Sequence, residues 1–183
     1  MLHNEKELIK RITNGEIELF SIIAEHYAQA VHTLIVRIVG SQEDAEELTQ
    51  DVLLRAFEHL RMFSHKSSLS TWIYRIAYNL AISYTRHRRL SYYSIDENRI
   101  RQVQDDELEQ MEATADNEQH IEALARAIRQ LDAEERALIT LFYYEERSVA
   151  ECAEITAQSQ TNIKVRLHRI RKKLYILLKD GKK

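Results

Sequence analysis

Residues 148–174 read SVAECAEITAQSQTNIKVRLHRIRKKL, and this stretch has the spacing of a helix-turn-helix. It predicts one helix over about 148–156 and a second over about 159–178, with a short break between them. Ala153 supplies the small side chain that is needed where two such helices cross. Ser159 is a favoured capping residue for the start of the second helix.

The outer face of this second helix carries polar and basic side chains. Amides, hydroxyls and aliphatic groups near a helix start can read base edges, while lysine and arginine further along bind phosphates. The residues predicted to contact DNA are Gln160, Thr161, Lys164, Val165, Arg166, His168, Arg169 and Lys172. A solvated basic helix would show the same spacing. However, residues 159–183 carry nine basic side chains and one acidic side chain, which favours DNA binding.

The composition extends the helical prediction to the whole chain. The 183 residues include three glycines and no proline, the residues that strand-rich folds and α/β enzymes need in their turns. We therefore expect an all-α protein with two small helical domains, residues 1–92 and 119–183, the second of which contains the helix-turn-helix. Residues 93–118 are expected to form an acidic linker with weak apolar periodicity.

The net charge of −3 hides large local charges. Residues 59–95 contain six basic and no acidic side chains, whereas residues 96–118 contain nine acidic and two basic ones. Basic blocks in an acidic chain indicate a protein that binds polyanions. The stretch 59–95 also contains seven aromatic residues, which suits stacking on unpaired bases, although we expect most of these rings to lie in the core.

The expected helix over 42–60 has an acidic outer face that includes Glu47, Gln50 and Asp51, with Leu54 as an exposed apolar residue. Such a face is often simply exposed to solvent, with no partner. The more specific interpretation is a docking surface for a basic protein, because the carboxylates would attract that protein and the leucine would be buried on contact.

Other classes of function find little support. The single cysteine, Cys152, leaves no thiol cluster for a metal and is expected to be a small core residue. The eight histidines show no HExxH spacing, and nucleotide-binding and hydrolase motifs are missing. We expect no metal, no cofactor and no enzymatic activity. The N-terminus lacks the apolar core of a signal peptide, so we expect a cytoplasmic protein without membrane insertion.

Three stretches resemble the extracytoplasmic-function sigma factors, the smallest two-domain members of the bacterial sigma-70 family. They are AEELTQDVLLRAFEHLRMF (45–63), SSLSTWIYRIAYNLAISYTRHRR (67–89) and the opening stretch 148–174. The resemblance covers roughly residues 8–178, in the order that the family has. It implies a dissociable subunit that binds core RNA polymerase and directs initiation at promoter DNA through the −10 and −35 elements.

The resemblance also implies roles for particular residues. The polymerase clamp would be bound through Glu47, Gln50, Asp51 and Leu54. The −10 element would be melted and held by Ser67, Ser68, Ser70, Arg75, Asn79, Arg86, Arg88 and Arg89. The −35 element would be read by the outer face of the last helix. Many such proteins are held inactive by an anti-sigma factor, which is therefore a further expected partner.

Two features leave alternatives open. At the turn, Thr156, Ala157 and Gln158 depart from the family's pattern of an apolar residue, glycine and an apolar residue. Alanine in a left-handed turn costs roughly 1 kcal/mol more than glycine, which favours another turn geometry. A self-sufficient regulator, with a first domain that binds a ligand or dimerises, is the main functional alternative, ahead of a helical scaffold or an enzyme. Its ligand domain would have no need of the acid-free surface at 59–95.

Overall fold

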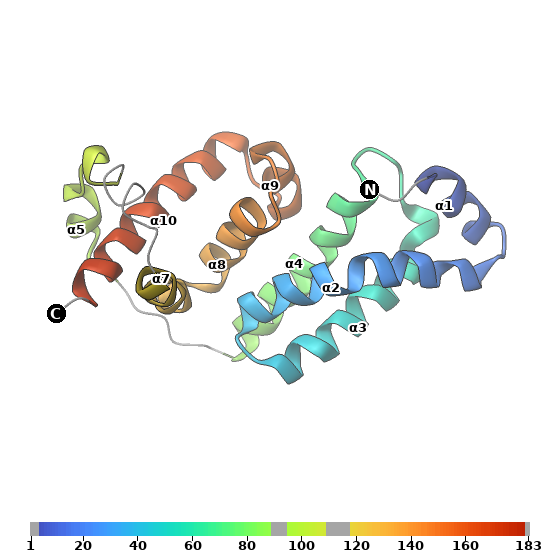
Figure 1. Cartoon of the computed structure of the whole chain (residues 1–183). Coiled ribbons are helices and arrows are strands. Elements are labelled where there is room, and N and C mark those ends of the chain that lie inside the picture. The colour runs from blue at the N-terminus through green and yellow to red at the C-terminus, as the bar shows by residue number, and fades with distance from the viewer. Residues whose placement is uncertain (1–3, 89–94, 109–117, 182–183) are drawn as a thin grey trace.

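The computed structural model describes residues 4–88, 95–108 and 118–181, and within these ranges it contains helices and no strand, which confirms the all-α prediction (Figure 1). The N-terminal part contains α1 (Glu5–Thr13), η1 (Ile17–Leu19), α2 (Phe20–Val39), α3 (Gln42–His59), η2 (Leu60–Met62) and α4 (Leu69–Arg88). The remainder contains α5 (Glu97–Gln102), α7 (Glu118–Gln130), α8 (Ala133–Ile139), the π-helical turn η3 (Thr140–Tyr144), α9 (Val149–Thr156) and α10 (Gln160–Asp180).

The N-terminal bundle packs α2, α3 and α4 around a continuous apolar core. Its helices are separated where the sequence places capping residues. Gly40 ends α2 in the left-handed conformation, with φ of 80°, and its N–H donates to Val36 O at 2.8 Å. Ser41 then caps α3, since its hydroxyl accepts a hydrogen bond from Asp44 N–H at 3.3 Å. As a result, α2 and α3 form a helical hairpin, which buries residues such as Ile35 completely.

The C-terminal bundle starts its helices at capping pairs. Asp132 and Glu135 form a reciprocal capping box at the start of α8, and Ser148 and Glu151 form another at the start of α9. Each box satisfies backbone N–H groups that have no partner inside the helix. Helix α9 therefore begins where the sequence predicts.

The helix-turn-helix is confirmed, and its turn, whose geometry the sequence left open, is left-handed. Ala157 adopts this conformation, with φ of 56° and ψ of 40°, despite the cost to a residue other than glycine. The hydrogen bond from Gln158 N–H to Ala153 O, 3.0 Å long, closes the end of α9 and helps to offset the strain. Ser159 caps α10 by accepting from Asn162 N–H at 3.2 Å.

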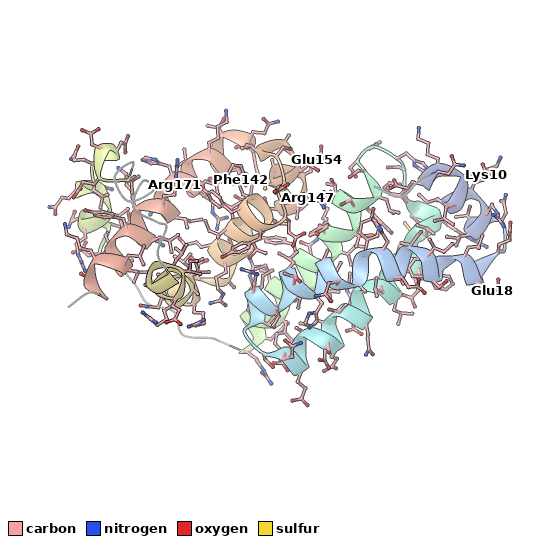
Figure 2. The ribbon with its side chains drawn as sticks, viewed as in Figure 1. Lys10, Glu18, Phe142, Arg147, Glu154 and Arg171 are labelled. Carbon is pink, nitrogen blue, oxygen red and sulfur yellow. The ribbon has the colours of Figure 1, made fainter. Side chains whose placement is uncertain are left out.

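The two bundles pack against each other, because α9 and α8 lie on α4 and α2 (Figure 1). The Tyr74 hydroxyl donates to the Glu145 carboxylate, and the Arg147 guanidinium lies 4.5 Å from the Tyr74 ring centroid. Figure 2 shows Arg147 at this junction. Tyr78 is 6% exposed, and burial raises its pKa to about 12. These tyrosines therefore lie in the junction and are not available to stack on bases.

Residues 95–108 differ from the expectation of a linker with little apolar pattern. Asp96 caps α5, which lies against α10 (Figure 1), and residues 105–108 are also helical. Ile100, Val103 and Leu108 are 2%, 6% and 5% exposed. With Ile95, which is also buried, these apolar side chains are enough to attach the short acidic segment to its neighbour.

Candidate nucleic-acid interface

The first turns of α10 present the residues that were predicted to read DNA. Gln160, Thr161, Lys164 and Val165 are all exposed, and Val165 is 53% exposed. They share one side of α10 because residues three to four positions apart lie above one another on a helix. The opposite side, which includes Ile163, is buried. The reading surface is thus solvent-facing over the N-terminal third of α10.

The cations further along α10 are already paired with carboxylates of the chain itself. Arg166 pairs with Glu134 at 3.3 Å, and Arg169 pairs with Glu97. Asp105 lies 3.4 Å from the imidazole of His168 and 3.4 Å from the ammonium of Lys172, which also donates to Val103 O at 2.7 Å. The residues predicted to bind phosphate therefore face the acidic segment 95–108 and α8.

The α4 helix brings together three of the predicted side chains. Arg75, Asn79 and Arg86 are exposed and recur at steps of four and seven residues, so they lie along one face of the helix. Arg86 pairs with Glu134 at 3.0 Å. Ile82, which lies one turn before Arg86, is 5% exposed and belongs to the buried side of α4.

Two further arginines were predicted at the C-terminal end of α4. Arg88 pairs with Asp44 at 2.8 Å, while its side chain remains 58% exposed. Exposed pairs of this kind contribute about 1 kcal/mol or less and exchange readily for a phosphate partner. Arg89 lies outside the described residues.

The serines before α4 are less uniform than predicted. The Ser68 hydroxyl accepts from Thr71 N–H at 3.0 Å and therefore caps α4. Ser67 and Ser70 are half-buried, and Ser70 lies beside Tyr27, whose pKa burial raises to about 12. A base held by this loop would meet Ser67 and the exposed face of α4 before it met Ser70.

The acidic face of α3 is exposed as predicted. Glu47, Gln50 and Asp51 face solvent, and Leu54 is 55% exposed. The opposite side of α3, which includes Val52, is fully buried against α2 and α4. A leucine left in solvent among carboxylates is consistent with a protein-docking surface.

Glu134 is a residue that the sequence analysis missed. Its carboxylate pairs with Arg86 of α4 and with Arg166 of α10, so one side chain joins both predicted DNA-binding surfaces. An acidic residue in the first turn of a helix is common, because it interacts favourably with the helix dipole, so the position of Glu134 in α8 does not indicate the two ion pairs. In the sequence, only its location between two basic blocks points to them.

Other kinds of site find no support in the described part of the chain. Within it, no group of three metal-ligating side chains occurs and no helix is long and apolar enough to cross a membrane. Cys152 is fully buried, and burial raises its pKa to about 11, so its thiol is protonated at neutral pH.

Comparison with known proteins places this geometry in a family. The Sigma-70 region 2 model matches residues 23–90, and the Sigma-70, region 4 model matches residues 121–174. The ECF RNA polymerase sigma factor SigW of Bacillus subtilis is 29% identical over 182 residues, which is 96% of this chain and 97% of that protein.

Two solved structures share the fold. The sigma factor RpoE of Bartonella quintana, in complex with the anti-sigma factor NepR, is 22% identical with a TM-score of 0.64, over 87% of this chain and 96% of that one. CnrH, in complex with the cytosolic domain of CnrY, is 20% identical with a TM-score of 0.65, over 96% and 97%. With both family regions matched in order along most of its length, the chain belongs to the sigma-70 family, in the group of extracytoplasmic-function sigma factors.

Proposed function

We propose that this chain binds bacterial core RNA polymerase and directs transcription initiation at promoters through their −10 and −35 elements. The observation that carries the proposal is the presence, in one chain, of regions 2 and 4 of the sigma-70 family, each with a solvent-facing surface suited to DNA. The chain would supply promoter recognition, and the polymerase would supply catalysis. It would act in the cytoplasm, where promoter DNA lies.

We assign three surfaces to three contacts. The exposed face of α3, formed by Glu47, Gln50, Asp51 and Leu54, docks on the polymerase clamp. Residues 1–92 act on the −10 element through the loop before α4, Arg75, Asn79 and the arginines at the end of α4. Residues 119–183 act on the −35 element through the N-terminal turns of α10. The acidic stretch 93–118 joins them.

An anti-sigma factor fits the same proposal. Both relatives of similar fold were solved with such a partner or with a cytosolic domain bound. In this chain, the exposed faces of α3, α4 and α10 are the surfaces that polymerase and DNA would need, so a protein that covers them would block initiation. We therefore infer that an anti-sigma factor regulates this chain.

The direct test is run-off transcription with purified bacterial core polymerase, with and without the full chain, followed by mapping of the start sites. We expect transcripts from defined start sites only when the chain is present, because core polymerase alone does not select promoters. The Leu54→Glu variant serves as a control, since it places a charge at the centre of the docking face without disturbing the core. Equal transcription with and without the wild-type chain would rule the function out.

A second prediction concerns the free chain, which is expected to bind duplex DNA weakly because its own carboxylates occupy the cations of α10. Replacing Glu97 with glutamine and Asp105 with asparagine removes the partners of Arg169, His168 and Lys172. Since exposed pairs contribute up to about 1 kcal/mol each, we expect duplex binding to tighten roughly three- to tenfold at low salt.

Fluorescence anisotropy with a labelled duplex measures this change. The matched control removes two exposed carboxylates that do not contact α10 cations, by Asp106→Asn and Glu122→Gln. A general charge effect would give the same gain in the control, and that outcome would contradict specific masking of α10.

A further inference from the structure

The segment 140–147, which joins α8 to α9, departs twice from ordinary backbone geometry. Thr140–Tyr144 form the π-helical turn η3, and Glu145 N–H donates to Thr140 O, five residues earlier in the chain, at 2.9 Å. Glu146 then lies in the left-handed region, with φ of 50°, which is uncommon for a residue other than glycine, asparagine or aspartate. Both features cost free energy, and features of this kind are concentrated at functional sites.

The contacts that hold this segment come from the N-terminal bundle. The Arg37 guanidinium of α2 lies 3.6 Å from the ring centroid of Tyr144. The Glu145 carboxylate accepts a hydrogen bond from the hydroxyl of Tyr74 on α4, a residue that is 1% exposed, and the Arg147 guanidinium lies over the same ring. Burial and the carboxylate raise the pKa of Tyr74, so its hydroxyl keeps the proton that it donates. The unusual backbone is therefore supported by the other bundle.

The joined arrangement of the bundles cannot serve both promoter elements at once. Arg86 of α4 and Arg166 of α10 pair with the same carboxylate, that of Glu134, at 3.0 and 3.3 Å. The −10 and −35 elements are separated by about 25 base pairs, which is about 85 Å of duplex at about 3.4 Å per base pair. Two surfaces that share one side chain do not span this distance, so the bundles have to separate before both elements are bound.

We infer that residues 140–147 form a latch, which holds the free chain closed and is released when the bundles separate on core polymerase. In the closed form, Arg37 and Tyr74 hold the π-helical turn and the left-handed Glu146. Separation removes these contacts, so the segment relaxes and its strain favours the open form. Core polymerase shifts the equilibrium because it binds the open form more tightly. The inference rests on the proposed function, since binding to both promoter elements is what requires the open form.

The first experiment measures the distance between the bundles in the free, full-length chain. Spin labels are attached at Glu25→Cys on α2 and Glu154→Cys on α9, two exposed positions, while the native Cys152 is fully buried and does not react. Double electron–electron resonance should give a short distance for the chain with an intact latch. The latch variant, Tyr144→Ala with Glu145→Gln, should show a second, longer distance, with a closed-to-open ratio that is lower by tenfold or more.

The matched control makes the same chemical changes at adjacent residues, through Tyr143→Ala with Glu146→Gln, both exposed. The ring of Tyr143 packs on Phe142 of its own bundle at 4.9 Å, so the control should stay closed. Tyr74→Phe removes only the hydroxyl that Glu145 accepts from, and it should lower the closed-to-open ratio in the same direction as the latch variant. An unchanged distance distribution in the latch variant, or equal opening in the control, would overturn the latch.

The second experiment repeats the distance measurement in the complex with core polymerase. The chain with an intact latch should then show the longer distance. The latch variant should bind core polymerase more tightly, by up to the factor by which its closed-to-open ratio falls, because less binding free energy is used to open it. Retention of the short distance in the complex would overturn release of the latch. Failure of the wild-type chain to bind core polymerase at all would overturn the proposed function, whereas the closed free chain is tested separately by the first experiment.

Discussion

The Arg136→Ala substitution is expected to lower the free energy of unfolding by about 3 kcal/mol. Arg136 is 7% exposed, and its guanidinium donates to three backbone carbonyls. Two of them, Arg129 O at 3.3 Å and Leu131 O at 2.9 Å, lie at the C-terminal end of α7. The third is Ile38 O, at the C-terminal end of α2.

The physical reason is that helix ends leave carbonyls without intrahelical partners and carry partial negative charge. One guanidinium satisfies such carbonyls on two helices from different bundles. Its removal leaves them buried without a donor, and each unsatisfied group costs about 1–3 kcal/mol. Part of the loss therefore falls on the junction between the bundles.

Urea denaturation followed by circular dichroism at 222 nm measures this loss. The control is Arg126→Ala, which removes an exposed arginine whose ion pair with Glu122 is 3.7 Å long and which should cost less than about 0.5 kcal/mol. Arg136→Lys should recover part of the stability, because an ammonium can reach some but not all of the carbonyls. A loss below about 1 kcal/mol for Arg136→Ala would contradict the bridging role.

The Asn79→Ala substitution is expected to slow promoter opening roughly 10- to 100-fold while polymerase binding stays unchanged. Asn79 is exposed on α4, one turn beyond Arg75, and its amide can donate to and accept from a base edge. A good contact of this kind contributes about 1–3 kcal/mol of discrimination. The docking face on α3 lies on a different helix, so the affinity for core polymerase should not change.

Permanganate reactivity of unpaired thymines measures opening, and native gel shift measures polymerase binding. Ser83→Ala is the matched control, because Ser83 is also exposed on α4, one turn further from the loop. It should open promoters at the wild-type rate. If Asn79→Ala reduced polymerase binding and opening by the same factor, its assigned contact with the −10 strand would be wrong.

The helices and their ends were predictable because their signals are local. Gly40 with Ser41, Asp132 with Glu135, and Ser159 each act on backbone groups within four residues, so the sequence contains both partners of each interaction. The exposed reading face of α10 follows from the same short-range periodicity. The turn at Ala157 stayed open at the level of the sequence, because the hydrogen bond from Gln158 N–H to Ala153 O that helps to offset its cost is visible only in the structure.

The ion pairs that the predicted DNA-binding residues form within the chain were not predictable. The sequence shows that acidic and basic blocks alternate, but not that Glu134 bridges Arg86 and Arg166 or that Asp105 faces Lys172. Opposite charges attract, but a charged side chain in the sequence does not indicate which opposite charge it will pair with. The acidic segment 95–108 pairs with α10 because buried apolar residues such as Val103 hold the segment against that helix.

From its amino-acid order alone, the chain is all-helical, has a helix-turn-helix and carries basic surfaces suited to DNA, since each of these properties depends on neighbours a few residues away. Folding in three dimensions selected which faces meet. Tyr74 and Tyr78 lie in the junction because they are packed against the second bundle, and Arg136 donates to a carbonyl 98 positions away in the chain. Since every residue has a backbone carbonyl, the sequence cannot indicate which one Arg136 will bond. Packing of the whole molecule determines that partner.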